Sequence, residues 1–179
     1  LYDLNVQQYC AAGLNFGYYY ERSPLIAYDG VAAPIYTMAA YTPSTVPGCR
    51  TPHVWLADGR SLYDAMGAGY TLLRTDAAVD AAPLLRAAAA KGVPIALLDL
   101  SRAVAGAVYD HALVLSRPDR HVAWRGMQLP DDVAALVETI RGAGPSDVAA
   151  PKMRPGRARG ADAASKTPPG IAPGAAAPV

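Results

Sequence analysis

The sequence predicts a mixed α/β fold for residues 49–143. Short apolar runs typical of strands alternate there with segments of helical periodicity, and the connections between them are short. The last two strand-like runs, 112–116 and 121–125, flank a four-residue turn with Pro118 at its second position, a pattern that predicts a β-hairpin. A helical stripe follows the hairpin and completes the predicted domain.

The predicted domain opens with a short strand at 54–56, which ends at the Asp58-Gly59 turn. Ser61 is a favourable N-cap for a brief helix over 61–66, because its hydroxyl can accept a hydrogen bond from a free N–H of the first turn. A second strand is expected over 69–74.

A longer helix is expected to begin at Asp80 and to end at Lys91-Gly92, a cation followed by a helix terminator. The next run, 93–100, is apolar almost throughout, which is typical of a central parallel strand covered on both faces. Pro94 stands at its start, where a missing backbone donor is tolerated.

A short helix is expected over 103–109, before the hairpin. After the hairpin, Asp131 and Asp132 offer acidic residues at a helix start, and an apolar stripe runs on to Ile140. The resulting order is βαβαβαββα. This is the order of a thioredoxin-like sandwich, in which the last two strands form an antiparallel pair.

The predicted domain has irregular flanks on both sides. Residues 1–48 lack a self-contained fold and are rich in tyrosine, which buries a large area yet keeps one polar end. Packing of these tyrosines against another surface is favoured over substrate contact; they are Tyr18, Tyr19, Tyr20, Tyr28, Tyr36 and Tyr41. Residues 144–179 form a linker and a Pro/Ala/Gly-rich tail that is expected to be disordered.

The formal net charge of +1 hides two parts of opposite sign. The tail from Pro151 carries +4 and the other 150 residues carry −3, so the folded part offers no basic surface for nucleic acid. Binding of nucleic acid by the tail would depend on five scattered cations.

No apolar run approaches the roughly 20 residues of a membrane-spanning helix and no signal peptide is evident, so a cytoplasmic protein without a membrane partner is expected.

The sequence predicts no catalytic, cofactor-binding or metal-binding residue. The loop 57–61, where the predicted topology would place a redox dithiol, contains no sulfur, and Cys10 and Cys49 are far apart in the chain. The three histidines, His53, His111 and His121, lack the spacing of a metal site. A Gly-x-Gly-x-x-Gly phosphate loop is absent from the sequence.

Four segments taken together resemble a known family: 17–24, 47–64, 69–74 and 113–126. They are similar, in consistent order, to the C-terminal end of FAD-dependent aromatic-ring hydroxylases, the phenol-hydroxylase and polyketide-hydroxylase group of flavoprotein monooxygenases. The residues that carry the family signature are expected at a domain junction, with a structural role: Gly48, Arg50, Pro52, His53, Asp58 and Gly59.

The resemblance implies that FAD and NAD(P)H act in a catalytic part that this chain lacks. It also implies that the thioredoxin-like domain has no redox dithiol, supports structure and, in some members, makes dimer contacts, so a homodimer is one partner that it allows. On this interpretation residues 1–48 are the end of the catalytic part and a connector. The start at Leu1 rather than Met agrees with a chain that begins inside a longer protein.

Two hypotheses follow from the sequence. The first is that the chain is the C-terminal accessory portion of a bacterial FAD-dependent aromatic hydroxylase and is inactive alone, which leaves open whether it should be called an enzyme. The second is that it is a free-standing thioredoxin-like protein-binding module, which pairs with a separate flavin subunit through its Tyr-rich segment. The aromatic substrate is not predicted, because the pocket residues would lie in the missing part.

Overall fold

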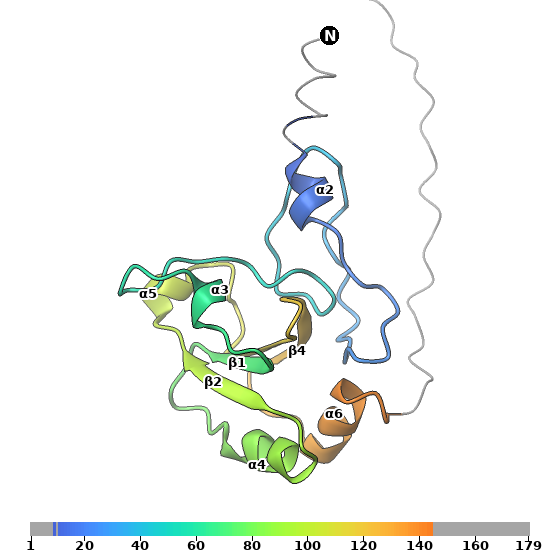
Figure 1. Cartoon of the computed structure of the whole chain (residues 1–179), viewed down its shortest axis with the longest axis vertical. Helices are drawn as coiled ribbons and strands as arrows, with labels where there is room; N and C mark the ends of the chain where they lie inside the picture. The colour runs from blue at the N-terminus through green and yellow to red at the C-terminus, as the bar shows by residue number, and fades with distance from the viewer. Residues whose placement is uncertain (1–8, 10, 145–179) are drawn as a thin grey trace, which may run out of the picture.

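The computed structural model describes residue 9 and residues 11–144, and the predicted disordered tail lies outside this range. A four-stranded mixed sheet in the order β2-β1-β3-β4 is at its centre (Figure 1). β1 pairs with β2 in parallel, and the β1–β3 and β3–β4 pairs are antiparallel. The strands are β1 (Tyr70–Arg74), β2 (Ile95–Asp99), β3 (Leu113–Ser116) and β4 (Val122–Gly126). This is the predicted α/β fold, with four of the five predicted strands in the sheet.

Helices cover both faces of the sheet (Figure 1). One core packs Leu72 and Leu115 against α4 (Ala82–Ala90) and α6 (Val133–Ile140). The other packs Leu73 and its neighbours against two short helices, α3 (Leu62–Ala65) and α5 (Arg102–Ala105). Adjacent residues of β1 serve opposite cores because successive side chains of a strand point to opposite faces.

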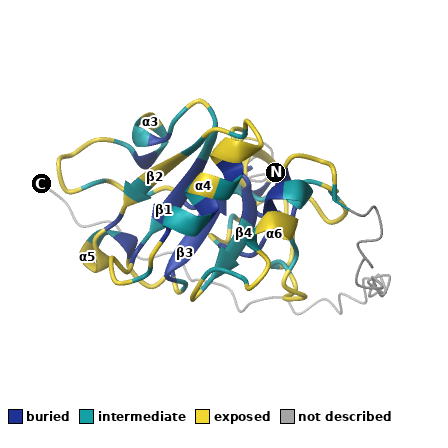
Figure 2. Cartoon of the chain, turned by 90° about the horizontal axis from the view of Figure 1, so that it is seen from below, coloured by how far each residue is buried: buried dark blue, intermediate teal, exposed yellow. Residues whose placement is uncertain are grey.

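The prediction of a central strand over 93–100 is wrong, because β2 lies at the edge of the sheet. The central, buried strands are instead β1 and β3, and all four residues of β3 are buried (Figure 2). β2 has no fully buried residue, and Leu97 is 37% exposed. An apolar run shows that a strand is hydrophobic, but it does not show where the strand lies in the sheet. Because β2 pairs with only one other strand, part of the surface of β2 stays uncovered.

The predicted strand at 54–56 is also absent from the sheet. Trp55 forms only an isolated bridge with Ser61, and the segment folds back through hydrogen bonds from Leu56 N–H to the Arg60 carbonyl and from Leu62 N–H to the Val54 carbonyl. Since the first strand of the sheet is β1, the position of a redox dithiol corresponds to the loop 75–81 rather than 57–61. That loop also contains no cysteine.

The helix starts largely follow the sequence. Ser61 caps α3 by accepting from the Tyr63 N–H, and Asp132 caps α6 by accepting from the Ala135 N–H. The Asp80 carboxylate accepts from the Ala82 N–H at the start of α4. The predicted helix over 103–109 is shorter than expected, because α5 ends at Gly106, whose φ of 59° leaves the helical region.

The N-terminal segment contains α2 (Ala12–Phe16) and otherwise runs irregularly to residue 48 (Figure 1). Single hydrogen bonds join it to the domain: Ala27 N–H donates to the Ala123 carbonyl and Gly48 N–H to the Val122 carbonyl. Ile26 is fully buried. In the part of the chain that the structure describes, no helix is both long and apolar enough to cross a membrane.

Candidate functional site

Four of the six signature residues lie on one stretch of chain, 48–53, where the N-terminal segment meets the domain. Gly48 has a φ of 98°, and a Cβ there would collide with the carbonyl oxygen of Tyr20. Tyr20 N–H donates to the Gly48 carbonyl at 3.0 Å, and Arg50 forms an antiparallel bridge with His121. Close backbone approach therefore explains why glycine stands at the start of this junction.

Pro52 and His53 are held by polar contacts to the domain. The carbonyl oxygen of Pro52 accepts a hydrogen bond of 2.5 Å from the hydroxyl of Tyr109, a fully buried residue. Desolvation raises the pKa of the Tyr109 phenol, so this donor keeps its proton. His53 Nε2 lies 2.9 Å from the hydroxyl of Ser61, the N-cap of α3.

A chain of rings runs from His53 toward the N-terminal segment. The His53 ring meets Trp55 at 4.9 Å and Tyr63 at 5.3 Å, both edge to face. Arg50 continues the chain, since its guanidinium carbon lies 5.4 Å from the Tyr63 ring and 5.6 Å from the Phe16 ring. The Arg50 cation thus contacts two aromatic faces, one from the domain and one from the N-terminal segment.

His121 is the centre of a second aromatic cluster. Its ring is 1% exposed and lies 5.1 Å from the Tyr18 ring and 4.7 Å from the Tyr20 ring. Nδ1 donates to the carbonyl oxygen of Asp119, while Nε2 is buried and has no partner in the structure. Desolvation lowers the pKa of His121, against an opposing effect of Asp119, and therefore favours the neutral ring.

The buried side-chain polar atoms that lack a hydrogen-bond partner, among the residues described, all belong to this junction: Tyr41 Oη, Arg50 Nε and His121 Nε2. Tyr41 lies beside Arg50, with its ring 6.0 Å from that of Phe16. Desolvation is the largest effect in raising the pKa of Tyr41 to about 12, so its hydroxyl remains a donor at neutral pH. Buried polar groups are normally paired, so these three atoms need partners that the described residues do not supply.

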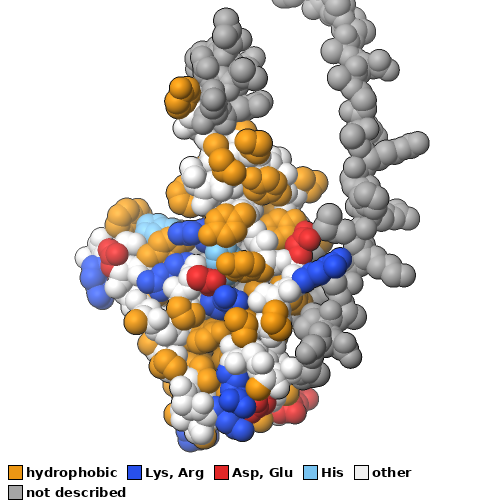
Figure 3. Space-filling model, turned by 45° about the vertical axis from the view of Figure 1, so that its right-hand side comes forward, with side chains coloured by type: hydrophobic (Ala, Val, Ile, Leu, Met, Phe, Trp, Pro, Cys, Tyr) orange, Lys and Arg blue, Asp and Glu red, His pale blue; other side chains and the backbone are white. Residues whose placement is uncertain are grey.

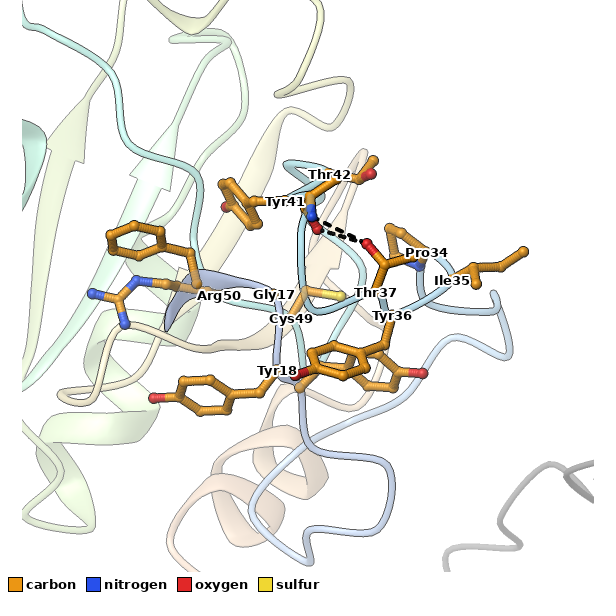
Figure 4. Close-up of a pocket in the computed structure, with 13 residues that line it drawn as sticks. Gly17, Tyr18, Pro34, Ile35, Tyr36, Thr37, Tyr41, Thr42, Cys49 and Arg50 are labelled. Carbon is orange, nitrogen blue, oxygen red and sulfur yellow. Dashed lines mark hydrogen bonds between the residues drawn. The ribbon is translucent and has the colours of Figure 1, made fainter. Parts of the chain in front are cut away.

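A small cavity of about 20 Å³ lies at this junction (Figure 4). Its lining comes from 16–19, 34–37, 40–42 and the pair Cys49 and Arg50. Figure 4 shows the Arg50 side chain extending away from Ile35 and Tyr36, toward the domain. Burial raises the pKa of the Cys49 thiol, which disfavours the reactive thiolate.

Asp58 and Gly59 do not join the junction. They form the exposed turn after Trp55, where the Asp58 carboxylate accepts from the backbone N–H of Arg60 at 3.0 Å and from its side chain at 2.7 Å. The backbone N–H of Arg60 is the main cause that lowers the pKa of Asp58. Within the described range, no hydrogen bond, ion pair or ring contact connects this turn to Arg50.

Sequence reasoning missed the partners that surround Arg50. Phe16 and Tyr63 lie 34 and 13 residues from it in the sequence, so no local spacing connects them. The position of His121 opposite Arg50 depends on the hairpin register, which no local spacing predicts. The unusual density of tyrosine before residue 42 was the one usable signal.

The junction cavity is far too small for FAD. Besides the 20 Å³ cavity, the structure has a pocket of about 290 Å³ beside the 56–60 turn and the start of α5, at the low end of the range for small-ligand sites. Asp58, Arg60 and Asp99 line that pocket, and both carboxylates are already paired, Asp58 with Arg60 and Asp99 with Arg74. In residues 9 and 11–144 there is also no group of three or more His, Cys, Asp or Glu side chains that could hold a metal ion.

Comparison with known proteins places these features in a family. The sequence profile of the family described as "Aromatic-ring hydroxylase, C-terminal" matches residues 44–144. The chain belongs to this family. The match includes the junction residues Gly48, Arg50, Pro52 and His53 and the whole four-stranded sheet.

Relatives of this aromatic-ring hydroxylase C-terminal domain are flavin-dependent monooxygenases. The chain is 30% identical over 161 residues to phenol 2-monooxygenase of Pseudomonas sp. (strain EST1001), a match that covers 79% of this chain and 26% of the relative. It is 33% identical over 122 residues to the FAD-dependent monooxygenase apdD of Emericella nidulans, covering 64% of this chain and 20% of the relative. The chain therefore spans about a quarter or less of the length of these two curated relatives.

Solved structures agree with the family assignment. RebC, in a chromopyrrolic acid-soaked structure with bound 7-carboxy-K252c, superimposes with a TM-score of 0.69 at 35% identity, covering 77% of this chain and 26% of that one. The flavin-dependent monooxygenase PieE, solved with FAD and substrate, gives a TM-score of 0.61 at 28% identity, with 76% and 27% covered.

Proposed function

We propose that this chain is the C-terminal accessory portion of an FAD-dependent aromatic hydroxylase and that it has no flavin chemistry of its own. The observation that carries this proposal is the family match over residues 44–144, combined with coverage of about a quarter of the phenol 2-monooxygenase relative. The size of the junction cavity, which is far too small for FAD, supports it. FAD, NAD(P)H and the aromatic substrate would then bind in the part of the enzyme outside this chain.

The proposed role of the domain is to hold the end of the catalytic part in place. In this division, residues 1–48 complete the catalytic part, 49–143 form the thioredoxin-like domain and 144–179 are a linker and tail. Ile26 fills a buried site, and Asp29 pairs with Arg125 of β4 at 2.8 Å. The Arg125 side chain is only 7% exposed and also donates to the Thr45 hydroxyl, so the arginine end of this ion pair is shielded from water.

The proposal is tested on the purified chain of 179 residues. We expect no flavin absorbance after incubation with FAD and gel filtration, and no NAD(P)H oxidation with or without phenol. The Pseudomonas phenol 2-monooxygenase, treated in the same way, is the positive control. Stoichiometric flavin retention or phenol-stimulated NAD(P)H oxidation by the chain would refute the proposal.

A free-standing module that pairs with a separate flavin subunit is the second candidate. It is favoured by one observation: nine of the twelve large apolar side chains that the structure leaves exposed lie between residues 9 and 38 (Figure 3). Such a concentration is typical of a surface that a partner covers. Stable co-purification with a separately encoded flavoprotein would support the module. Aggregation of the chain alone, with no such partner in its host, would support the accessory portion.

A further inference from the structure

We propose that Arg50 is the cation of a carboxylate-binding site at the junction. In the assembled enzyme this site takes an aspartate or glutamate side chain from the part outside this chain, an assignment that rests on the function proposed above. Three observations carry the proposal: the missing partner of Arg50, the aromatic faces that it contacts, and the small cavity that it shares with Tyr41.

Arg50 differs from every other shielded arginine in the described part of the chain. Five arginines there are not exposed, and the other four have hydrogen-bonding partners. Three of them bind carboxylates, and Arg120 donates to backbone carbonyls; these four are Arg74, Arg117, Arg120 and Arg125. Arg50 has no hydrogen bond or ion pair with a described residue, and its Nε is buried. A buried N–H donor without an acceptor is costly, so a partner for Arg50 Nε is expected from elsewhere.

The rings in contact with Arg50 help to determine which partner fits. The guanidinium carbon of Arg50 lies over the Phe16 ring and over the Tyr63 ring, so neither ring supplies an anion to its N–H groups. A carboxylate matches the edge of a planar guanidinium with two parallel hydrogen bonds. Tyr63 is fixed in turn, because its hydroxyl donates to the Thr51 carbonyl at 2.5 Å.

The cavity sets the size of the group. Arg50 and Tyr41 both line it, and its volume of about 20 Å³ exceeds the roughly 10–15 Å³ that one water needs. This is room for one small polar group but not for an aromatic ring. A side-chain carboxylate that enters from a covering surface fits this limit, with its carbon stem outside, whereas a free aromatic acid does not.

The surroundings indicate that the carboxylate comes with a large apolar surface. Exposed apolar side chains of the same segment line the cavity, among them Phe16 and Tyr18, with Ile35 and Tyr36 on the side away from the guanidinium. Figure 3 shows apolar side chains gathered over this part of the molecule, with basic side chains, coloured blue, among them. Within one enzyme the carboxylate would be present at a high effective concentration, so weak intrinsic affinity is sufficient.

Sodium acetate is the probe, used with the full chain of 179 residues at constant ionic strength. We expect a saturable change in the NMR shift of the Arg50 Nε–H, with a dissociation constant in the millimolar range or above. Sodium chloride and the neutral analogue acetamide should not reproduce it. Equal, non-saturating shifts of Arg50 and of the exposed Arg22 would overturn the proposal.

Variants add a second readout. Acetate should raise the melting temperature of the wild-type chain and of an Arg22→Gln control, but its apparent affinity should fall at least tenfold in Arg50→Gln. Arg50→Lys keeps the charge without the planar fork, and it should show the same loss if Arg50→Gln does not fold. Undiminished acetate binding in the folded Arg50 variant would contradict the assignment.

Benzoate distinguishes the two sources of a carboxylate. Binding no tighter than that of acetate supports a protein side chain, whereas binding more than tenfold tighter would mean a free aromatic acid and would overturn the assignment to the enzyme's own carboxylate. The result of the acetate experiment is separate from that of the flavin test. Flavin retention would refute the proposed function and leave the acetate result unchanged, whereas absence of both flavin and acetate binding would refute only this inference.

Discussion

Gly48 and Gly59 have backbone angles of the same sign but very different surroundings. Their φ values are 98° and 82°, so an alanine at either position adopts an unfavourable conformation. A Cβ at Gly59 would meet nothing within 4 Å, whereas a Cβ at Gly48 would collide with the Tyr20 backbone. The junction is therefore much less tolerant than the exposed turn, although both glycines belong to the family signature.

We predict that Gly59→Ala lowers the free energy of unfolding by about 1 kcal/mol, the cost of the backbone angle alone. Gly48→Ala should cost roughly 1–3 kcal/mol more, because the Tyr20 backbone must move. Urea denaturation followed by circular dichroism measures both values. Equal losses for the two variants would show that the close contact at Gly48 is not maintained in solution.

His121 gives the chain a stability that depends on pH. Burial lowers the pKa of its imidazole in the folded state, with smaller contributions from the nearby cations of Arg50 and Arg117 and an opposing one from Asp119. A lowered pKa means that the unfolded chain binds the proton more tightly. The stability is therefore complete above the ordinary histidine pKa of about 6.5 and decreases as the pH falls through that value.

We predict that the urea midpoint falls between pH 8 and pH 5 and that His121→Gln flattens this dependence. The carboxylates with lowered pKa, among them Asp58, Asp99 and Glu138, lose their contribution only below this window. His53→Gln is the control, because His53 is exposed and should leave the slope unchanged. If the urea midpoint of His121→Gln still fell with pH as in the wild-type chain, the effect would come from another group.

At the scale of elements, the order of the strands determines which leucines stabilise the sheet. Leu72 of β1 and Leu97 of β2 are direct partners in the parallel register, yet Leu72 is fully buried and Leu97 is 37% exposed. We predict a loss of about 2–5 kcal/mol for Leu72→Ala and of less than about 1 kcal/mol for Leu97→Ala. Denaturation midpoints in urea measure both. Comparable losses would mean that β2 is covered in solution.

Local chemistry explains why the sequence predicts the element starts well. Ser61, Asp80 and Asp132 each accept a hydrogen bond from a backbone N–H at a helix start, an interaction over two or three residues that the sequence contains in full. The β3–β4 hairpin was equally accessible, since its turn is continuous in the chain and Arg120 N–H donates to the Arg117 carbonyl within it.

Strand position and the aromatic junction could not be predicted in this way. The run 93–100 is apolar enough for a central strand, but whether another strand lies beyond it depends on the path of the whole chain. The 54–56 segment has the composition of a strand but pairs only with its own turn. Similarly, the contacts of Arg50 with Phe16 and Tyr63 arise from tertiary packing, which no motif in the sequence encodes.

At the scale of the whole molecule, exposed apolar surface is distributed very unevenly. Apart from Trp55, Leu97 and Met127, every large apolar side chain that the structure leaves exposed lies between residues 9 and 38. The most exposed of them is Ile35 at 89%, and Met38 is 56% exposed. Since apolar area removed from water contributes about 25 cal/mol per Å², this segment should bind other apolar surfaces when the chain is alone.

We therefore predict that the isolated chain self-associates reversibly and that the N-terminal segment is the contact. The double variant Ile35→Ser with Met38→Ser should weaken association by about tenfold or more, because each substitution removes exposed apolar area worth on the order of 1 kcal/mol. Its melting temperature as a monomer should not change, since neither side chain is buried. Sedimentation velocity over a range of protein concentrations measures the association.

The control is Leu97→Ser with Met127→Ser, which alters exposed apolar side chains on β2 and just after β4 and should have a smaller effect. If the control weakened association more, the contact would be the free edge of β2, and two chains would be joined by extension of the sheet.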